Sequence, residues 1–379
     1  MKIAFVTPEY PHQNFGKSGG VGTSIYGLTK ALKELGHTVS VLVYGQKKDA
    51  YFEEQGIHFY TIKNIKLKGL SLILTQKKVE RLINALYDQG RLELVEAPDW
   101  TGFTAFVKPK CPVVIRENGS DTYFCHLEQR PVKFKNKFLE RRALKRADGI
   151  ISVSRFTGEL TNKVLGLKRP FEVIPNSVNI NEFNPNHSDK QPLTILYFGT
   201  LIRKKGLFEL VEIFNRVHEK NKEVKLVLVG HDSGDIKTGK TSTWSLMQPV
   251  FTASAIKQVQ YLGGVNHQMI QEVINAATVC VFPSFAEAFP LSWLEAMAME
   301  KPIVASNIGW AKEMINDDKE GFLVHPKAHD NYAHRILELL NNQQKREDFG
   351  KAARKRVIKD FSHMEIAGKS VEFYKPFIK

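Results

Sequence analysis

The chain has 379 residues, of which 42% are hydrophobic and 25% are charged, and its formal net charge is +14. This length predicts two domains, and the composition excludes a chain that is mostly disordered. No apolar run approaches the roughly 18 residues of a transmembrane helix, and the first residues lack the pattern of a secretion signal. The three cysteines lie far apart, which argues against a disulfide framework or a zinc cluster, so we expect a cytoplasmic protein.

The positive charge is concentrated in the first half of the chain. Residues 1–185 carry 28 basic and 18 acidic residues, against 26 and 22 in residues 186–379. The densest basic segment runs from Arg130 to Arg146 and holds eight basic residues and one acid, Glu140. Such a surface attracts phosphorylated substrates, nucleic acid or an anionic membrane, and a solvated helix face explains it equally well. The sequence has no nucleic-acid recognition motif, so we expect no nucleic acid as a partner.

Short β-branched runs alternate with longer amphipathic stretches along nearly the whole chain. This alternation predicts parallel sheets with helices on both faces. In the first half, the predicted strands are 3–7, 38–44, 92–96, 113–116, 149–153 and 171–174, and the clearest helices are 22–35, 76–88 and 134–147. In the second half, the predicted strands are 193–198, 224–229, 259–262, 279–282, 303–305 and 321–324.

The order of these elements predicts the domain organisation. Residues 181–192 are rich in Asn and Pro and are typical of a linker. We therefore expect an α/β fold of two Rossmann-like, doubly wound parallel-sheet domains, residues 1–185 and 193–361, which face a central cleft. Residues 362–379 have a helical period and follow a complete second domain, so this helix could pack elsewhere.

The obvious ligand of such a fold is a nicotinamide dinucleotide, and the glycine positions argue against it. The first predicted strand ends at Thr7, whereas the glycines of the dinucleotide fingerprint are needed immediately after it. The second strand ends without a carboxylate, and the chain contains no P-loop motif. The glycines come later, at Gly19, Gly20 and Gly22, before a predicted helix, where bare backbone N–H groups can bind a phosphate or simply form a turn.

Two segments of the second half carry groups that suit a sugar nucleotide. Arg203 and Lys205 follow a predicted strand, where cations suit a leaving diphosphate, although an exposed basic loop is equally consistent. Glu287 lies in the loop after another strand, and Glu295 lies one turn into the following helix. A helix start beside two carboxylates can bind a phosphate through its N–H groups and sugar hydroxyls through its acids. A capping acid with a structural ion pair is the alternative.

At these residues the sequence resembles the retaining glycosyltransferases of family 4, which have the GT-B fold. Glu287 and Glu295 lie within P-S-x-x-E-x-F-P-x-x-x-x-E-A-M-A, a signature of that family. The resemblance continues in order through 19–22, 173–179, 205–206, 228–230, 262–265 and 321–324. The family's last helix crosses back onto the first domain, which is expected here for residues 362–379.

The resemblance implies roles for the matched residues. Glu287 is expected to hold hydroxyls of the transferred sugar, Glu295 the ribose, and Lys205 with Arg203 the leaving diphosphate. The first domain is expected on the acceptor side and the second to bind the donor. Further expected donor contacts are Phe289, Pro290, Leu291, Ser292, Gly263, Val265, Gly19 and Gly20, with His231 as a less specific candidate. Because these groups supply the positive charge, we expect no metal and no cofactor.

Two positions depart from the family pattern. Thr200 stands where many members have arginine, so we assign that role to Arg203, and Asn118 stands where many have histidine. Asn118 can donate a hydrogen bond to a sugar but cannot act as a base, which agrees with front-side attack in which the leaving phosphate accepts the proton. The same substitutions are also consistent with weak or lost activity.

The resemblance implies transfer of a hexose from a nucleoside-diphosphate sugar to a glycan or lipid-linked acceptor. Bacterial surface-polysaccharide assembly is the expected setting, with residues 130–146 in peripheral contact with an anionic membrane. The alternatives are a transferase or phosphorylase of the same fold that uses a sugar phosphate, and a non-catalytic protein that binds nucleotide or sugar.

Overall fold

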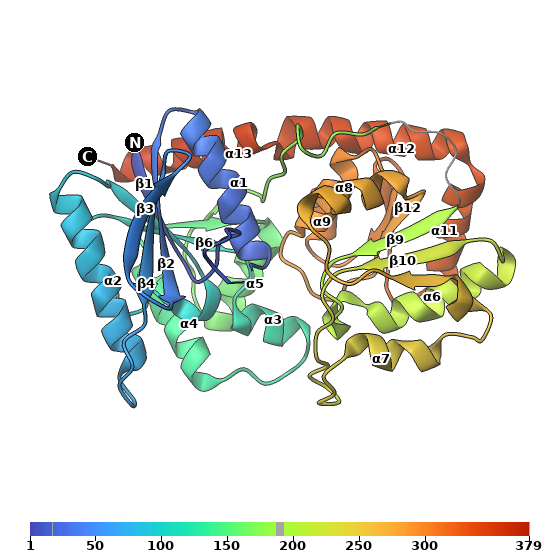
Figure 1. Cartoon of the computed structure of the whole chain (residues 1–379), viewed down its shortest axis with the longest axis horizontal. Helices are drawn as coiled ribbons and strands as arrows, with labels where there is room; N and C mark the ends of the chain where they lie inside the picture. The colour runs from blue at the N-terminus through green and yellow to red at the C-terminus, as the bar shows by residue number, and fades with distance from the viewer. Residues whose placement is uncertain (17, 187–192, 379) are drawn as a thin grey trace. The chain divides into compact units, whose positions relative to one another are not determined.

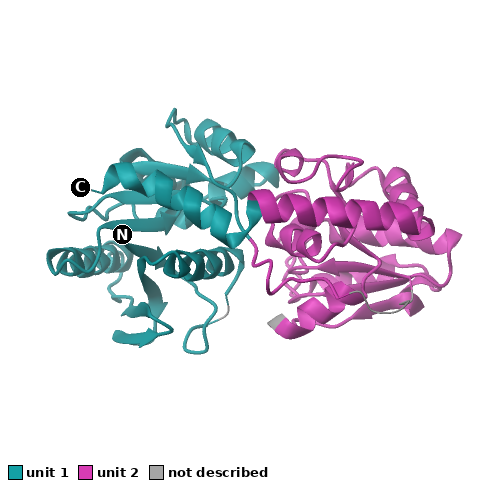
Figure 2. Ribbon diagram, turned by 90° about the horizontal axis from the view of Figure 1, so that it is seen from above, with its two compact units in different colours: residues 1–177, 361–379 teal, residues 178–360 magenta. Residues whose placement is uncertain are grey.

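The computed structural model describes residues 1–16, 18–186 and 193–378. The chain divides into two compact units, coloured separately in Figure 2. Unit 1 comprises Met1–Ser177 and Phe361–Lys379, and unit 2 comprises Val178–Asp360. Of the predicted linker, residues 181–186 belong to unit 2, and residues 187–192 lie outside the described residues.

Unit 1 is built on an eight-stranded sheet of order β3-β4-β2-β1-β5-β6-β7-β8 (Figure 1). Every neighbouring pair is parallel except β3 and β4, which are antiparallel. The chain passes from β1 to β2 and then to the β3–β4 pair on one side, and from β5 through β6 and β7 to β8 on the other, so the winding reverses between β1 and β5. The strands are β1 Lys2–Thr7, β2 Thr38–Gln46, β3 Ala50–Glu54, β4 Ile57–Lys63, β5 Leu94–Pro98, β6 Val113–Glu117, β7 Gly149–Ser152 and β8 Glu172–Val173.

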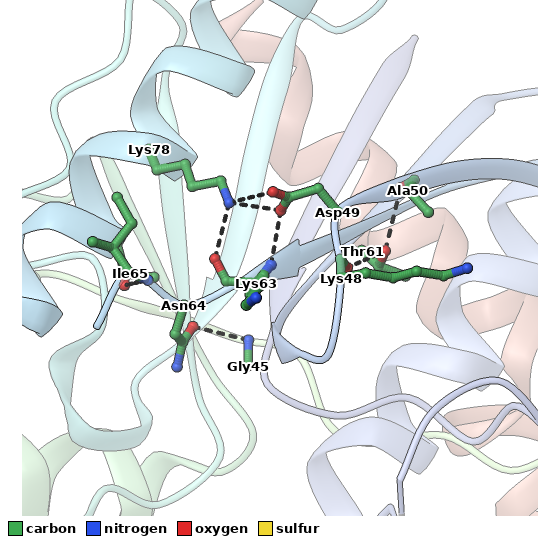
Figure 3. Close-up of polar contacts among 10 residues, drawn as sticks. Gly45, Lys48, Asp49, Ala50, Thr61, Lys63, Asn64, Ile65 and Lys78 are labelled. Atoms are coloured by element: carbon green, nitrogen blue, oxygen red, sulfur yellow. Dashed lines mark hydrogen bonds and ion pairs between the residues drawn. The ribbon is translucent and has the colours of Figure 1, made fainter.

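All six strands predicted for the first half are confirmed within a few residues, and β3 and β4 were not predicted. Figure 3 shows the polar contacts that hold this edge in place. Asp49, before β3, accepts hydrogen bonds from the backbone N–H of Lys63 at 2.8 Å and from Lys78 Nζ at 2.6 Å. Asn64 accepts from the N–H of Gly45 at 3.0 Å. The antiparallel strand therefore ends the sheet in a short edge fixed to helix α2, Ser71–Asp88.

Helices cover both faces of the unit 1 sheet, as the alternation of side chains along β1 requires. Ile3 and Phe5 lie in a core with residues of α1 and α13, whereas Ala4 and Val6 lie in a second core with residues of α2. This is the doubly wound arrangement predicted from the sequence. The helices are α1 Gly20–Glu34, α2 Ser71–Asp88, α3 Asp121–Leu127, α4 Phe134–Arg146, α5 Arg155–Leu165 and α13 His363–Tyr374, with 3-10 turns at Trp100–Gly102 and Lys375–Phe377.

Helix α13 returns from the end of the chain to complete unit 1. A buried network joins it to the sheet: Arg116 pairs with Glu96 (Nε–Oε1, 2.8 Å) and donates to Ser370 Oγ at 3.1 Å. Tyr374 donates its hydroxyl proton to Glu96. Arg116 is 3% exposed and Glu96 is 2% exposed, so these charges depend on one another for stabilisation.

Unit 2 has a six-stranded, all-parallel sheet of order β11-β10-β9-β12-β13-β14. Its six strands match the six predicted ones, which confirms the predicted fold class of two Rossmann-like, doubly wound sheets. The strands are β9 Thr194–Phe198, β10 Lys225–Val229, β11 Val259–Tyr261, β12 Val279–Phe282, β13 Ile303–Ser306 and β14 Gly321–Val324. The helices are α6 Leu207–Lys220, α7 Thr243–Met247, α8 His267–Ala276, α9 Leu291–Ala298, α10 Ala311–Met314, α11 His329–Asn341 and α12 Gln343–Arg356, with 3-10 turns at Arg203–Lys205, Gln248–Val250 and Ala255–Gln258 and a π-helical turn at Val357–Phe361.

Candidate active site

The order of strands in unit 2 identifies where a ligand can bind. The chain proceeds outward from β9 through β10 to β11, and then from β12 through β13 to β14 on the other side. Strands β9 and β12 are therefore neighbours at which the winding reverses. In open α/β sheets, the loops after two such strands separate and leave room for a ligand at their carboxyl ends. The loop after β9 carries Lys205, and the loop after β12 carries Glu287.

The structure brings these two predicted residues into direct contact. Lys205 Nζ lies 2.5 Å from Glu287 Oε1, and the side chains are 20% and 9% exposed. Gly206 is what allows the loops to meet: its φ is +71°, and a Cβ there would lie 1.8 Å from the carbonyl oxygen of Pro283. The N–H of Phe285 also donates to the carbonyl of Lys204 at 2.8 Å. The cation and the carboxylate are thus fixed by glycine geometry and backbone bonding between the two loops.

Arg203 has a different partner from Lys205. Its Nε and Nη2 donate to the two carboxylate oxygens of Asp235 at 2.7 and 2.8 Å, and its guanidinium lies 4.1 Å from the centre of the Phe208 ring. Asp235 also accepts from the hydroxyl of Thr238 at 2.8 Å. The hydrogen bond from Arg203 lowers the pKa of Asp235 well below its usual range, and the same bond raises the pKa of Arg203. Sequence reasoning missed Asp235, because nothing near Arg203 in the chain indicates a partner 32 residues away.

His231 and the 263–265 segment lie together beside the carboxyl ends of β10 and β11. The N–H of Gly230 donates to the carbonyl of Gly263 at 2.8 Å. A Cβ on Gly264 would lie 2.4 Å from Cε1 of His231, so the imidazole ring lies directly against this glycine. His231 is exposed, and Val265 is half-buried. This arrangement offers a flat surface with an exposed ring, which suits an aromatic base.

Helix α9 begins beside Glu287 in sequence. Its N-terminal cap is Pro290, which provides no side-chain cap for the first turn. The N–H groups of a first helical turn and the helix dipole favour an anion there. Of the predicted donor contacts, Phe289 and Pro290 are buried, whereas Leu291, Ser292 and Glu295 are half-buried.

In unit 1, the glycine segment does begin a helix, but a carboxylate already lies at its N-terminus. Helix α1 begins at Gly20, and Gly19 and Gly20 are exposed. The N–H of Gly22 donates to Glu9 Oε1 at 2.9 Å, and a Cβ on Gly19 would lie 3.3 Å from the same oxygen. Sequence reasoning missed Glu9, which competes with any phosphate for these N–H groups.

Asn118 follows β6 at the carboxyl edge of the unit 1 sheet. Its backbone N–H donates to Asp99 Oδ1 at 3.0 Å, and its Nδ2 contacts the carbonyl of Arg116 at 3.4 Å. Within the described residues, the buried oxygens Asn118 Oδ1, Asp99 Oδ2 and Glu117 Oε2 have no hydrogen-bond partner. Burial raises the pKa of Asp99 to about 8 and that of Glu117 well above its usual range. Because a raised pKa favours the protonated carboxyl group, Asp99 and Glu117 can donate as well as accept, and together with Asn118 Oδ1 they offer hydrogen-bonding capacity that suits a ligand hydroxyl.

Within the part of the chain that the structure describes, no group of three or more His, Cys, Asp or Glu side chains is placed to hold a metal ion. In the same residues, no helix combines the length and apolar character needed to cross a membrane.

Taken together, the fold and the unit 2 site define a GT-B type glycosyltransferase. Two family models match the chain: Glycosyltransferase Family 4 over residues 18–182 and Glycosyl transferases group 1 over residues 178–356. The matches cover both units in order, and the chain belongs to glycosyltransferase family 4. It is a glycosyltransferase of the hexosyltransferase class, EC 2.4, that uses nucleotide sugars.

Individual relatives agree with this assignment. The alpha-maltose-1-phosphate synthase of Mycolicibacterium smegmatis is 26% identical over 416 residues, which cover 99% of each chain. The capsular polysaccharide biosynthesis glycosyltransferase CapM of Staphylococcus aureus is 28% identical over 192 residues, 48% of this chain and 46% of CapM. Among solved structures, the Anabaena protein HepE in complex with UDP and glucose has a TM-score of 0.77 at 20% identity and covers 99% of each chain.

Proposed function

We propose that this glycosyltransferase binds its donor at the carboxyl edge of the unit 2 sheet and transfers a hexose with retention of anomeric configuration. The contact between Lys205 and Glu287 is the observation that supports this most strongly. A cation and a carboxylate held together at the reversal of the winding match the two halves of a sugar diphosphate, an anionic leaving group and a hydroxylated ring.

Each donor contact follows from this position. Lys205 and the first N–H groups of α9 neutralise the diphosphate, and Glu287 accepts hydrogen bonds from the sugar hydroxyls. Glu295 accepts from the ribose, while Gly263, Val265 and His231 line the base. Arg203 contributes its positive field while it stays bound to Asp235. Gly19 and Gly20 contact the donor phosphate or the acceptor, and Asn118 contacts the acceptor.

The chemistry needs no protein base in this proposal. The bond between the anomeric carbon and the phosphate oxygen breaks, and the acceptor oxygen bonds to the same face of that carbon. The departing phosphate oxygen takes the acceptor proton. Asn118, which cannot accept a proton at neutral pH, orients an acceptor hydroxyl instead.

The acceptor that we propose is a glycan or a lipid-linked sugar in bacterial surface-polysaccharide assembly. The similarity to CapM supports this setting, and so does the basic segment 130–146, which suits a lipid diphosphate or an anionic membrane. A free sugar phosphate is the second candidate acceptor, because the similarity to a maltose-1-phosphate synthase extends over 99% of this chain.

A donor screen tests the proposal. UDP-, GDP-, ADP- and dTDP-sugars are compared for thermal stabilisation and hydrolysis, with wild type, Lys205→Ala and Lys220→Ala. Lys220 is an exposed lysine at the end of α6 and serves as the matched control. We expect one nucleotide class to stabilise wild type and Lys220→Ala but not Lys205→Ala. Equal stabilisation of all three proteins would place the donor elsewhere. A glycan, a lipid-linked sugar and a sugar phosphate, each offered with that donor, then separate the two acceptor candidates.

A further inference from the structure

Helix α4 carries its charge on a face that also exposes two aromatic rings. The side of α4 that packs against unit 1 is formed by Leu139, Glu140, Ala143 and Leu144. On the opposite side, Phe134 is 84% exposed and Phe138 is 47% exposed. Helical spacing of three or four residues puts Phe134, Phe138, Arg141 and Lys145 on one stripe. We call these four residues the α4 stripe.

Only some of the basic residues around this stripe form ion pairs or hydrogen bonds within unit 1. Arg130 pairs with Asp121 and Glu128, and Arg142 donates to the carbonyl of Ala105 and lies over Phe106. Arg141 Nε donates to the carbonyl of Leu165, and this residue remains exposed. The remaining basic residues of the segment are exposed and have no ion-pair partner within the described residues: Lys133, Lys135, Lys137, Lys145 and Arg146.

The backbone of α4 is held firmly while this stripe stays outside. Glu140, fully buried, accepts hydrogen bonds from the N–H groups of Asp121 at 3.0 Å and Thr122 at 3.1 Å. Gly102 packs so closely that a Cβ would lie 2.2 Å from the backbone carbon of Leu139. The helix therefore cannot rotate to bury its two rings in unit 1.

Resting on the proposed function, we infer that the α4 stripe is a membrane-docking surface that inserts Phe134 and Phe138 into the headgroup–acyl boundary of an anionic bilayer. An amphipathic helix with aromatic residues flanked by Lys and Arg lies in the plane of such an interface. The lysines contact anionic headgroups, and the rings leave water for the acyl boundary. The occupant is a bilayer, because a polyanion such as nucleic acid would neutralise the lysines and leave an 84% exposed ring in water.

This inference differs from a purely electrostatic contact in its dependence on salt and on the rings. Surface attraction between lysines and headgroups is screened as ionic strength rises, whereas transfer of the rings from water is not. We therefore expect wild-type protein to bind vesicles of phosphatidylglycerol and phosphatidylcholine at low salt, to keep part of that binding at high salt, and to ignore pure phosphatidylcholine.

The decisive variant is the double substitution Phe134→Ser/Phe138→Ser, which keeps every charge. We expect it to bind the anionic vesicles at least tenfold more weakly than wild type and to lose binding completely at high salt. Ile236→Ser, which removes a 68% exposed side chain in unit 2, is the matched control and should bind like wild type. In Phe134→Trp, brominated lipid should quench added fluorescence beyond that of the four native tryptophans.

Donor hydrolysis without lipid is measured on the same proteins. Unchanged hydrolysis with lost vesicle binding in the double variant supports the inference. Equal vesicle binding by the double variant and wild type would overturn it, and so would an absence of quenching in Phe134→Trp. A wild-type dimer that the double variant converts to monomer would mean that a second copy of the chain covers the stripe. Vesicle binding without any donor turnover would contradict the proposed function and leave the docking surface intact.

Discussion

Removing either partner of the Lys205–Glu287 pair is expected to impair both catalysis and stability, to different extents. Lys205→Ala removes a cation that the proposed reaction needs as the phosphate departs. Loss of one such positioned charge costs about 10²–10³ in turnover, or about 2.7–4 kcal/mol in transition-state free energy. Glu287→Gln keeps the size of the side chain and removes its charge, so we expect a loss of about 10²-fold.

The same geometry sets the cost in stability. From the sequence alone, Glu287 is a loop acid whose loss should hardly affect folding, but the structure places it 9% exposed against Lys205. Lys205→Ala leaves a buried carboxylate without this cation, which costs about 1–3 kcal/mol of unfolding free energy. Glu287→Gln should cost less, because the 20% exposed ammonium of Lys205 can recover hydration.

Urea unfolding and donor turnover of both single variants and the double variant test this reasoning. Because the two groups are in contact, their effects should not add, and a coupling of about 0.5–3 kcal/mol is expected in unfolding free energy. Lys220→Ala should change neither quantity. Additive effects within about 0.3 kcal/mol would mean that the 2.5 Å contact is not formed in solution.

Other predictions concern Gly206, Asp99 and the metal requirement. Gly206→Ala should lose at least about 1 kcal/mol of stability, because its φ of +71° disfavours any Cβ and Pro283 leaves no space; a melting temperature equal to wild type would refute this. The pKa of Asp99 is about 8 in the folded state, so between about pH 4 and 8 the folded state binds more protons than the unfolded state does. The contribution of Asp99 to the free energy of unfolding therefore falls as pH rises through that window. Asp99→Asn should therefore flatten the pH profile of unfolding free energy, and an unchanged slope would show that another group is responsible. EDTA should leave transfer nearly intact, whereas a loss that Mg²⁺ or Mn²⁺ restores would contradict the assignment of charge to Lys205 and the α9 N-terminus.

The sequence predicts the fold well because parallel strands buried on both faces are long apolar runs. This holds for strands such as β7, β12 and β13, whose residues are all buried, whereas β3 and β4 interrupt the pattern of one strand followed by one helix. Strand β4 has the sequence IHFYTIK, in which apolar and polar residues largely alternate, and it lies directly after a Gln-Gly turn. This alternation with a period of two could have predicted β4 from the sequence.

The candidate site is predictable in part. Motifs identify Lys205 and Glu287 singly, yet their contact depends on the register of β9 against β12, which no local pattern encodes. Asp235 and Glu9 were missed for the same physical reason, because each acts on a residue distant in sequence. Asp99 directly follows the strand β5, which its position in the sequence indicates, but its raised pKa follows from complete burial, which the sequence does not report.

Helix α13 makes unit 1 discontinuous along the chain, and this has a consequence for synthesis. Unit 2 is one uninterrupted segment, so its core can close as soon as it has left the ribosome. Unit 1 must instead hold Arg116 and Glu96 without Ser370 and Tyr374 until all of unit 2 has been made. Nascent unit 1 therefore exposes the apolar face that α13 later covers, and a fragment ending at residue 177 should require residues 361–379 in trans, or fused to it, to become stable.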